Sequence, residues 1–134
     1  MKRTTGALVA MLVVVFLAAG PALAALPVIF GTDAAEQIEG TRYAEEIRGL
    51  GGGDVIVDGR GKDAVYGGSG ADNLIGYGGD TSVDRFYGGG GNDTVQSRDV
   101  PAVKDVLSCG GGTDTVYADK ADVISDDCER VKAW

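Results

Sequence analysis

The stretch that decides the fold is Gly67-Gly68-Ser69-Gly70-Ala71-Asp72-Asn73-Leu74-Ile75, which reads Gly-Gly-x-Gly-x-Asp-x-apolar-x. The same nine-residue pattern returns at residues 88–96 and 109–117, and it also fits residues 49–57 and 58–66. Position one of this unit is its first glycine, position six its Asp, and position eight its apolar residue. A chain that repeats itself at a fixed short period is built by stacking one small structural unit.

Ten units tile residues 31–125 when two insertions of three residues and one deletion of one residue are allowed. Position six is acidic in every unit: Glu36, Glu45, Asp54, Asp63, Asp72, Asp84, Asp93, Asp105, Asp114 and Asp122. Position eight is apolar in every unit: Ile38, Ile47, Ile56, Val65, Leu74, Phe86, Val95, Leu107, Val116 and Ile124. Because the frame is set by the glycines, the agreement at these two other positions establishes the repeat.

Each unit divides into a turn and a strand. Glycine reaches left-handed backbone angles that other residues avoid, so the first six residues can turn the chain sharply. The last three residues form a short strand that directs only position eight inward. Two units make one coil, and coils stacked about 4.8 Å apart join the position-eight side chains into a thin core. The sequence predicts an all-β fold, a parallel β-roll or right-handed β-helix-like solenoid of about five coils.

The N-terminal residues 1–24 have the pattern of a secretory signal peptide. Met1-Lys2-Arg3 precedes an apolar run over residues 7–19, and a small-x-small cleavage site ends at Ala24. Cleavage there predicts a secreted, extracellular protein with no membrane insertion. In the alternative, the apolar segment stays as an anchor and holds the protein at the cell surface.

Residues 25–134 are predicted to form one β-roll domain. Residues 31–48 make an N-terminal cap coil, residues 49–117 hold the well-matched repeats, and residues 118–134 make a C-terminal cap. Solenoids need such caps because their end coils have a neighbour on one side only.

Acidic residues outnumber basic residues, with 20 against 12 and no His in the whole chain. Loss of residues 1–24 would remove only two basic residues and no acidic one. Such a surface repels nucleic acid and attracts cations. Stacking would also bring the position-six carboxylates together, and ordering so many glycines costs entropy. Ca²⁺ offsets both costs, since it takes six to eight oxygen ligands from carboxylates and backbone carbonyls.

The unit resembles the RTX, or haemolysin-type, calcium-binding nonapeptide repeat. The resemblance covers residues 31–125 and is strongest over residues 49–75, 88–96 and 109–117. It implies Ca²⁺ held between the turns of neighbouring coils by position-six Asp side chains and glycine carbonyls. The expected function is a secreted calcium-binding β-roll that folds when it binds Ca²⁺. Alternatives are a calcium-stiffened adhesive module with a cell-wall, glycan or protein partner, and an accessory unit of a secreted enzyme.

Because one coil uses two units, the turns fall into two columns and ions lie between units n and n+2. In the first column we predict three strong sites, one between each successive pair of the carboxylates of Asp54, Asp72, Asp93 and Asp114. The other predicted ligands in these turns are Gly49, Gly51, Gly52, Gly67, Ser69, Gly70, Gly88, Gly90, Gly91, Gly110 and Gly112.

The second column departs from the motif. Asp63 keeps the expected turn, an insertion precedes Asp84, and the turn before Asp105 has no glycine. We expect one weak site here, at Asp63 and Asp84, or none. In the first two units the acid is Glu, and we expect Glu36 and Glu45 to be solvated.

Two pairs of residues test the predicted stacking. Cys109 and Cys128 are 19 residues apart, about one coil, so a disulfide between adjacent coils is expected, with two buried thiols as the alternative. Tyr66 and Tyr87 both occupy position nine on adjacent coils and are expected to stack on the surface.

Catalytic motifs are missing from the sequence. No His is present, and both Cys residues belong to the expected disulfide, so the usual acyl-transfer and zinc sites are excluded. Gly59-Arg60-Gly61-Lys62 lacks the Ser or Thr that a phosphate-binding loop requires. We therefore predict a binding protein and not an enzyme, and a chain that resembles a disordered linker when Ca²⁺ is withheld.

Overall fold

The computed structural model describes residues 25–134, so the predicted signal peptide lies outside the described residues. Within that range the regular structure consists of twelve strands in two six-stranded parallel sheets. Sheet A contains β1 (Val28–Phe30), β3 (Glu46–Arg48), β5 (Ala64–Ser69), β7 (Arg85–Gly90), β9 (Val106–Gly111) and β11 (Val123–Ile124). Sheet B contains β2 (Gln37–Glu39), β4 (Val55–Val57), β6 (Asn73–Ile75), β8 (Thr94–Gln96), β10 (Thr115–Ala118) and β12 (Arg130–Ala133).

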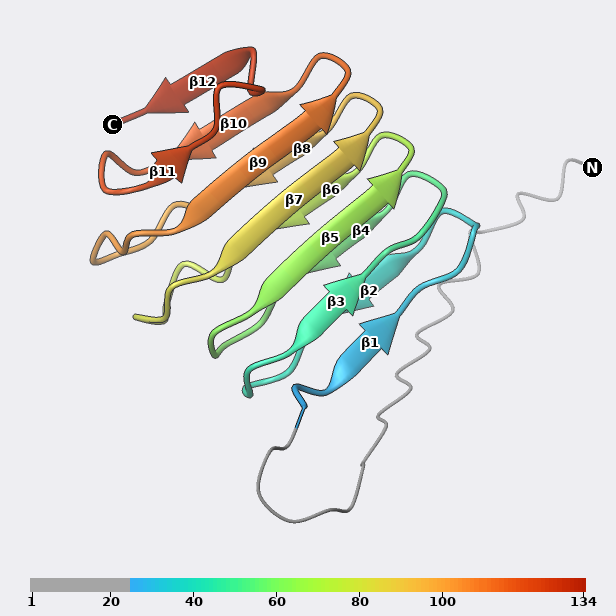
Figure 1. Ribbon diagram of the computed structural model, residues 1–134. Coiled ribbons are helices and arrows are strands. Elements are labelled where there is room, and N and C mark those ends of the chain that lie inside the picture. Colours follow the sequence, from blue (N-terminus) through green and yellow to red (C-terminus); the bar gives the residue numbers. More distant parts are fainter. Residues whose placement is uncertain (1–24) are drawn as a thin grey trace, which may run out of the picture.

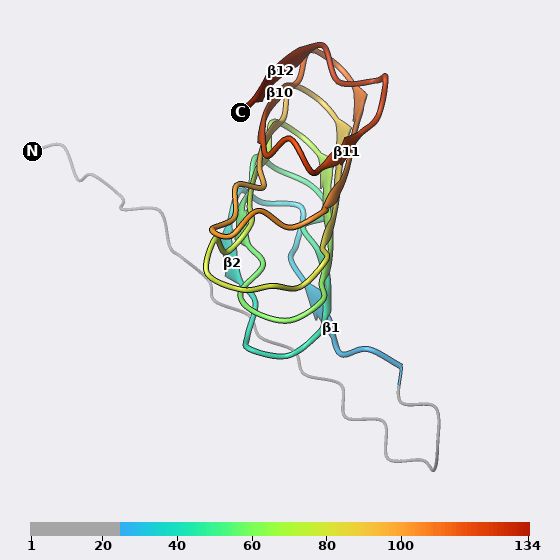
Figure 2. The same cartoon turned by 90° about the vertical axis from the view of Figure 1, so that its left-hand side faces the viewer.

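The chain alternates between the two sheets and so winds into a β-solenoid (Figure 1). Turned by 90°, the coils form a stack of flattened loops, with β1 and β11 on one side and β2, β10 and β12 on the other (Figure 2). Each sheet has six strands, so the solenoid has about six coils. The predicted all-β parallel roll is confirmed, with one coil more than expected.

The extra coil comes from strands outside the ten units. β1 precedes the first unit and places Ile29 in the core at 2% exposure, in register with Ile47 of β3. β12 follows the last unit and pairs in parallel with β10. Neither strand follows a glycine-rich turn, so the repeat pattern did not predict either strand.

The core is the predicted row of position-eight side chains. Nine of the ten are buried, and Ile124 near the C-terminal end packs against them while partly exposed. The strand registers pair them from coil to coil, as in Val65 with Phe86 and Phe86 with Leu107. Each of these pairs spans a three-residue insertion in the second column, yet the register is kept. The insertions therefore enlarge turns without disturbing the core.

Glycine is required at two turn positions for a backbone reason. In the unit that starts at Gly67, both Gly68 and Gly70 have positive φ, at 98° and 112°. A Cβ added at either would also overlap a carbonyl oxygen of the preceding coil, that of Leu50 or Gly52. The backbones of successive turns therefore approach too closely for a side chain at these two positions.

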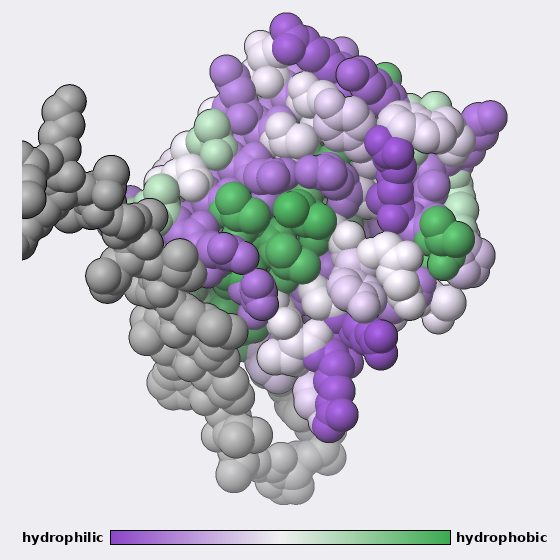
Figure 3. Space-filling model, turned by 180° about the vertical axis from the view of Figure 1, so that it is seen from behind, coloured by the Kyte–Doolittle hydropathy of each residue, from purple (hydrophilic) through white to green (hydrophobic). Residues whose placement is uncertain are grey.

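The outer faces of the sheets carry exposed or half-buried side chains. On sheet A, Tyr66 and Tyr87 stack with ring centroids 4.7 Å apart, which confirms the expected pair. Seen from behind, apolar side chains gather beside polar ones (Figure 3), and Val55 of β4 is 37% exposed.

Across residues 25–134 there is no helix of the length and apolarity needed to span a membrane.

Candidate metal centre

The turns form two columns at opposite ends of the strands. The first column follows the strands of sheet A and comprises residues 31–36, 49–54, 67–72, 88–93 and 109–114. The second column follows the strands of sheet B and comprises residues 40–45, 58–63, 76–84, 97–105 and 118–122. In Figure 1 the first column lies toward the upper right and the second toward the lower left.

In the first column, the position-six carboxylates form a ladder along the solenoid axis. The backbone N–H of Asp54 donates to Oδ1 of Asp72, that of Asp72 to Oδ1 of Asp93, and both distances are 2.8 Å. The ladder continues from the N–H of Asp93 to Asp114 Oδ1 at 2.7 Å. One oxygen of each carboxylate is therefore fixed by the coil that precedes it.

The second oxygen of each of these carboxylates is buried and unpaired. Oδ2 of Asp54, Asp72, Asp93 and Asp114 has no hydrogen-bond partner within residues 25–134, and all four residues are at most 2% exposed. Burial, together with the charge of neighbouring acids, raises the pKa of Asp72 and of Asp93 to about 6. A buried carboxylate oxygen without a partner is costly, and a cation would remove the cost.

Glycine at position one makes room for these oxygens. A Cβ added at Gly49 would lie 2.5 Å from both Asp54 Oδ2 and the carbonyl oxygen of Gly67. At Gly67 the corresponding distances are 2.6 Å to Asp72 Oδ2 and 2.6 Å to the carbonyl oxygen of Gly88. A carboxylate oxygen and a carbonyl oxygen thus converge beside a backbone that has no side chain.

These oxygens suit a hard cation. Ca²⁺ prefers carboxylates and backbone carbonyls, at distances of about 2.3 to 2.6 Å and with flexible geometry. The other predicted ligands belong to the same stack of turns, where backbone hydrogen bonds tie them together. Ser69 N–H donates to the carbonyl of Leu50 at 2.8 Å, and Gly70 N–H donates to that of Gly90 at 3.0 Å. The residues present therefore fit Ca²⁺, and the role of each as a ligand stays a prediction.

The second column carries the same ladder although its glycines are mostly lost. Glu45 N–H donates to Asp63 Oδ1 at 2.8 Å, and Asp63 N–H donates to Asp84 Oδ1 at 2.7 Å. It continues from Asp84 to Asp105 and from Asp105 to Asp122, each at 2.9 Å. Burial raises the pKa of Asp63, Asp84 and Asp105 to about 7. The acids of the second column are therefore aligned along the axis like those of the first, and the expectation of one weak site here, or none, stays a prediction.

Sequence reasoning also missed Asp58, which stands at position one where the motif has glycine. Its side chain is fully buried, and burial together with the charge of Asp84 raises its pKa to about 8. Single carboxylate oxygens of Asp58, Asp63 and Asp84 lie within 4.8 Å of one another. The sequence does show that Asp58 is an acid at a position where the motif has glycine, and this departure from the motif could have identified it.

The N-terminal cap differs from one expectation. Glu45, expected to be solvated, is buried at 3% exposure, and its carboxylate accepts hydrogen bonds from the N–H and hydroxyl groups of Thr41. The carboxylate of Glu36, which is half-buried, accepts the same two bonds from Thr32. Both Glu side chains fold back into their own turns, and the longer side chain makes this possible.

The C-terminal end is closed by the predicted disulfide. Cys109 and Cys128 are bonded, with Cα atoms 5.1 Å apart, so these sulfur atoms are not free thiolates. Asp127 accepts hydrogen bonds from the N–H groups of Cys109 and Gly110, at 3.1 and 2.9 Å. Glu129 accepts one from Asp114 N–H at 2.8 Å and so continues the first-column ladder by one step. The repeat frame ended before these two acids and did not identify them.

A comparison with protein families agrees with this geometry. The family model of the RTX calcium-binding nonapeptide repeat, in four copies, matches residues 48–83 and residues 59–95. No curated protein matched the chain. The matched residues include turns of both columns with their buried Asp side chains. The chain is therefore similar to the RTX calcium-binding nonapeptide repeat over residues 48–95.

Proposed function

We propose that this protein is a secreted calcium-binding β-roll that folds as Ca²⁺ enters the first column of turns. The observation that carries the proposal is the row of four buried Oδ2 atoms, on Asp54, Asp72, Asp93 and Asp114, that lack a partner in the described structure. The RTX match supports calcium as the cation. The proposed role is binding and not catalysis, and secretion rests on the sequence of residues 1–24 alone.

Three strong sites follow from the stacking, one between each successive pair of first-column turns. Asp72 and Asp93 each belong to two of these sites, while Asp54 and Asp114 each belong to one. Neighbouring sites therefore share ligands, and filling one site orders a turn that the next site also needs. Coupling between adjacent repeats makes cooperative binding the expected result.

Folding and binding are coupled because the metal-free fold is costly. It would bury several carboxylates that repel one another. The core is only one row of apolar side chains, so its burial contributes little free energy to offset that repulsion. Ca²⁺ binds the folded turns and not the unfolded chain, so its binding free energy becomes folding free energy.

A far-UV circular dichroism titration tests the proposal. In excess chelator the chain should show little strand signal, and Ca²⁺ should restore it in one cooperative transition. Mg²⁺ is the matched control and should be a poor substitute, because it demands a smaller octahedral shell and gives up its water reluctantly. Full strand content in chelator would contradict the proposal.

A second candidate function is a calcium-stiffened adhesive module. It is favoured by the aromatic ladder on sheet A, where Arg48 lies 5.4 Å from the ring centroid of Tyr66 and Tyr66 stacks on Tyr87. Such a strip could bind a sugar or a cell-wall polymer. Retention on cell-wall material with Ca²⁺, and its loss in the Tyr66→Ala, Tyr87→Ala double variant, would support this role.

A further inference from the structure

The second column contains a carboxylate that the repeat does not call for. Asp58 opens the unit of residues 58–66, and its side chain is 0% exposed. Its Oδ1 accepts a hydrogen bond from Tyr77 N–H at 2.7 Å, across to the next coil. Its Oδ2 has no partner among the described residues. The side chain is thus held in place by one oxygen and presents the other to the interior.

Two position-six carboxylates meet this oxygen. Asp63 comes from the same turn as Asp58, Asp84 comes from the next coil, and their exposures are 2% and 4%. Atoms of all three carboxylates lie within 4.8 Å of one another, and Asp63 Oδ2 also lacks a partner in the part of the chain described. Each first-column pair offers only two carboxylates, whereas this cluster offers three.

A fourth acid comes from the insertion in residues 76–84. Asp80 Oδ2 accepts a hydrogen bond from Gly61 N–H at 2.9 Å, which docks the enlarged turn against the turn of Asp58. The insertion therefore adds negative charge to the neighbourhood of the cluster and does not only lengthen the loop.

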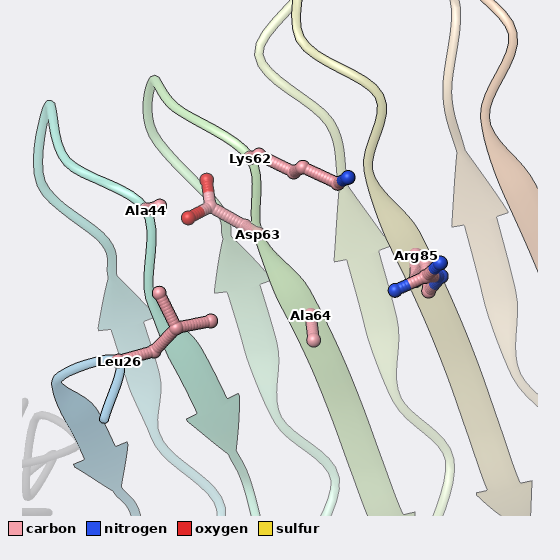
Figure 4. A pocket seen from close by; sticks show the side chains of 6 residues that line it. All are labelled: Leu26, Ala44, Lys62, Asp63, Ala64 and Arg85. Carbon is pink, nitrogen blue, oxygen red and sulfur yellow. The ribbon is translucent and has the colours of Figure 1, made fainter. Parts of the chain in front are cut away.

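No basic side chain of the described chain neutralises this cluster. Lys62 and Arg85 are its sequence neighbours, but Lys62 extends away from the carboxylate of Asp63, and Arg85 lies apart from that carboxylate on β7 (Figure 4). The one ion pair found within residues 25–134 joins Arg48 and Glu46 on the outer face of sheet A. Three buried carboxylates at this separation can all be ionised only if a cation joins them.

We infer that Asp58, Asp63 and Asp84 form a further calcium site in the second column, with Asp58 as a ligand that replaces the glycine of the motif. This inference rests on the proposed function and changes its stoichiometry from three ions to four. The three carboxylates make the site richer in charge than a first-column site, so a trivalent lanthanide should occupy it more tightly than Ca²⁺ does.

Restoring the motif provides the sharpest test. Asp58→Gly recreates the Gly-Gly-x-Gly-x-Asp turn, so a site that relied on the motif would bind Ca²⁺ as well as before or better. Our inference predicts the opposite, the loss of one ion per chain at saturating Ca²⁺, counted by calorimetry on the full chain. Asp58→Asn keeps an acceptor for Tyr77 N–H and should lose the same ion. Asp126→Asn, at an exposed acid, is the matched control and should lose none.

The outcomes separate this inference from the proposed function. If Asp72→Asn loses ions and Asp58→Gly loses none, only the second-column site is wrong. If the unmodified chain binds no Ca²⁺, the proposed function fails with it. Should both Asp58 variants fail to fold, crystals of the unmodified chain soaked with Tb³⁺ decide. An anomalous peak bounded by Asp58, Asp63 and Asp84 supports the site, and its absence there overturns it.

Discussion

Both columns of turns align buried carboxylates along the solenoid, but they do so with different residues. In the first column, most residues at positions one, two and four are glycines that keep the backbone tight, and four buried Asp side chains each have one oxygen without a partner among the described residues. In the second column most of these glycines are lost and two turns are enlarged, yet the ladder of position-six acids is unbroken. It also gains Asp58, an acid at position one.

The difference shows which part of the motif determines which feature. The glycines determine how closely successive turns can approach, because a Cβ at their positions would overlap the adjacent coil. The position-six acid and the position-eight apolar residue determine the stacking, and these persist where the glycines do not. A turn without its glycines can therefore still align carboxylates, with its extra length displaced outward from the core.

The largest effect that separates the columns is expected at Asp72. Asp72→Asn removes charge from two first-column sites at once, so the chain should bind two fewer ions and require markedly more Ca²⁺ to fold. Asp122→Asn in the second column should leave the ion count unchanged, because both Asp122 oxygens already accept hydrogen bonds, from Asp105, Ser97 and Asp119. Calorimetry on both variants measures this, and equal losses would remove the distinction between the columns.

Reduction of the disulfide should weaken the C-terminal end of the first column. The bond closes a loop of 19 residues, and a loop of this size stabilises a fold by roughly 3 kcal/mol through the entropy of the unfolded chain. Thermal unfolding in saturating Ca²⁺, with and without reductant, should show this loss. A Cys109→Ser, Cys128→Ser variant that melts with the oxidised protein would contradict it.

Substitutions at two glycines of the first column test how closely successive turns stack. Gly70 has a φ of 112°, and an added Cβ would overlap the carbonyl oxygen of Gly52, so Gly70→Ala should cost at least about 1–2 kcal/mol. Apart from Gly90 itself and its two chain neighbours, no atom of residues 25–134 lies within 4 Å of a Cβ added at Gly90, so Gly90→Ala should be nearly neutral. Calcium-dependent folding midpoints report both, and a neutral Gly70→Ala would show that the turns do not stack this closely.

The smallest expected difference is in pH dependence. Burial raises the pKa of Asp58 to about 8 and that of Asp63 and Asp84 to about 7, against about 6 for Asp72 and Asp93. Protons therefore compete with Ca²⁺ at higher pH in the second column than in the first. For each proton that Ca²⁺ displaces, the apparent calcium affinity falls by up to about tenfold per pH unit as the pH is lowered. Ion counts should fall by one between pH 8 and pH 6.5 before the first column empties. Simultaneous loss from both columns would contradict this order.

The metal-free fold should respond to pH in the opposite direction. Carboxyls whose pKa is raised on folding bind more protons in the folded state, so they favour the fold below their ordinary pKa of 3.8. That contribution is lost as the pH rises through about 6 to 8. In chelator, strand signal should therefore be greater at pH 5 than at pH 8.

The sequence predicted those features that depend on the period alone. The position-eight residues fixed the parallel register, and the spacing of Cys109 and Cys128 predicted their bond. The outer strands β1 and β12 could not be found in this way, since they stack on the repeats without carrying the motif.

The sites show the same division. The first-column carboxylates were predicted from the motif and are found in line. Asp58 was not, because its importance depends on a departure from the motif whose effect is visible only when the turns are stacked. Burial of Glu45 likewise depends on the contact of its own turn with the next coil, through Asp63.

Native mass spectrometry of the full chain tests whether calcium ions lie between stacked turns and fold the chain together. At intermediate Ca²⁺ we expect two populations, an extended chain of high charge state without ions and a compact chain with four ions. A compact chain that carries no ion, or ions that add one at a time to a chain already compact, would contradict it.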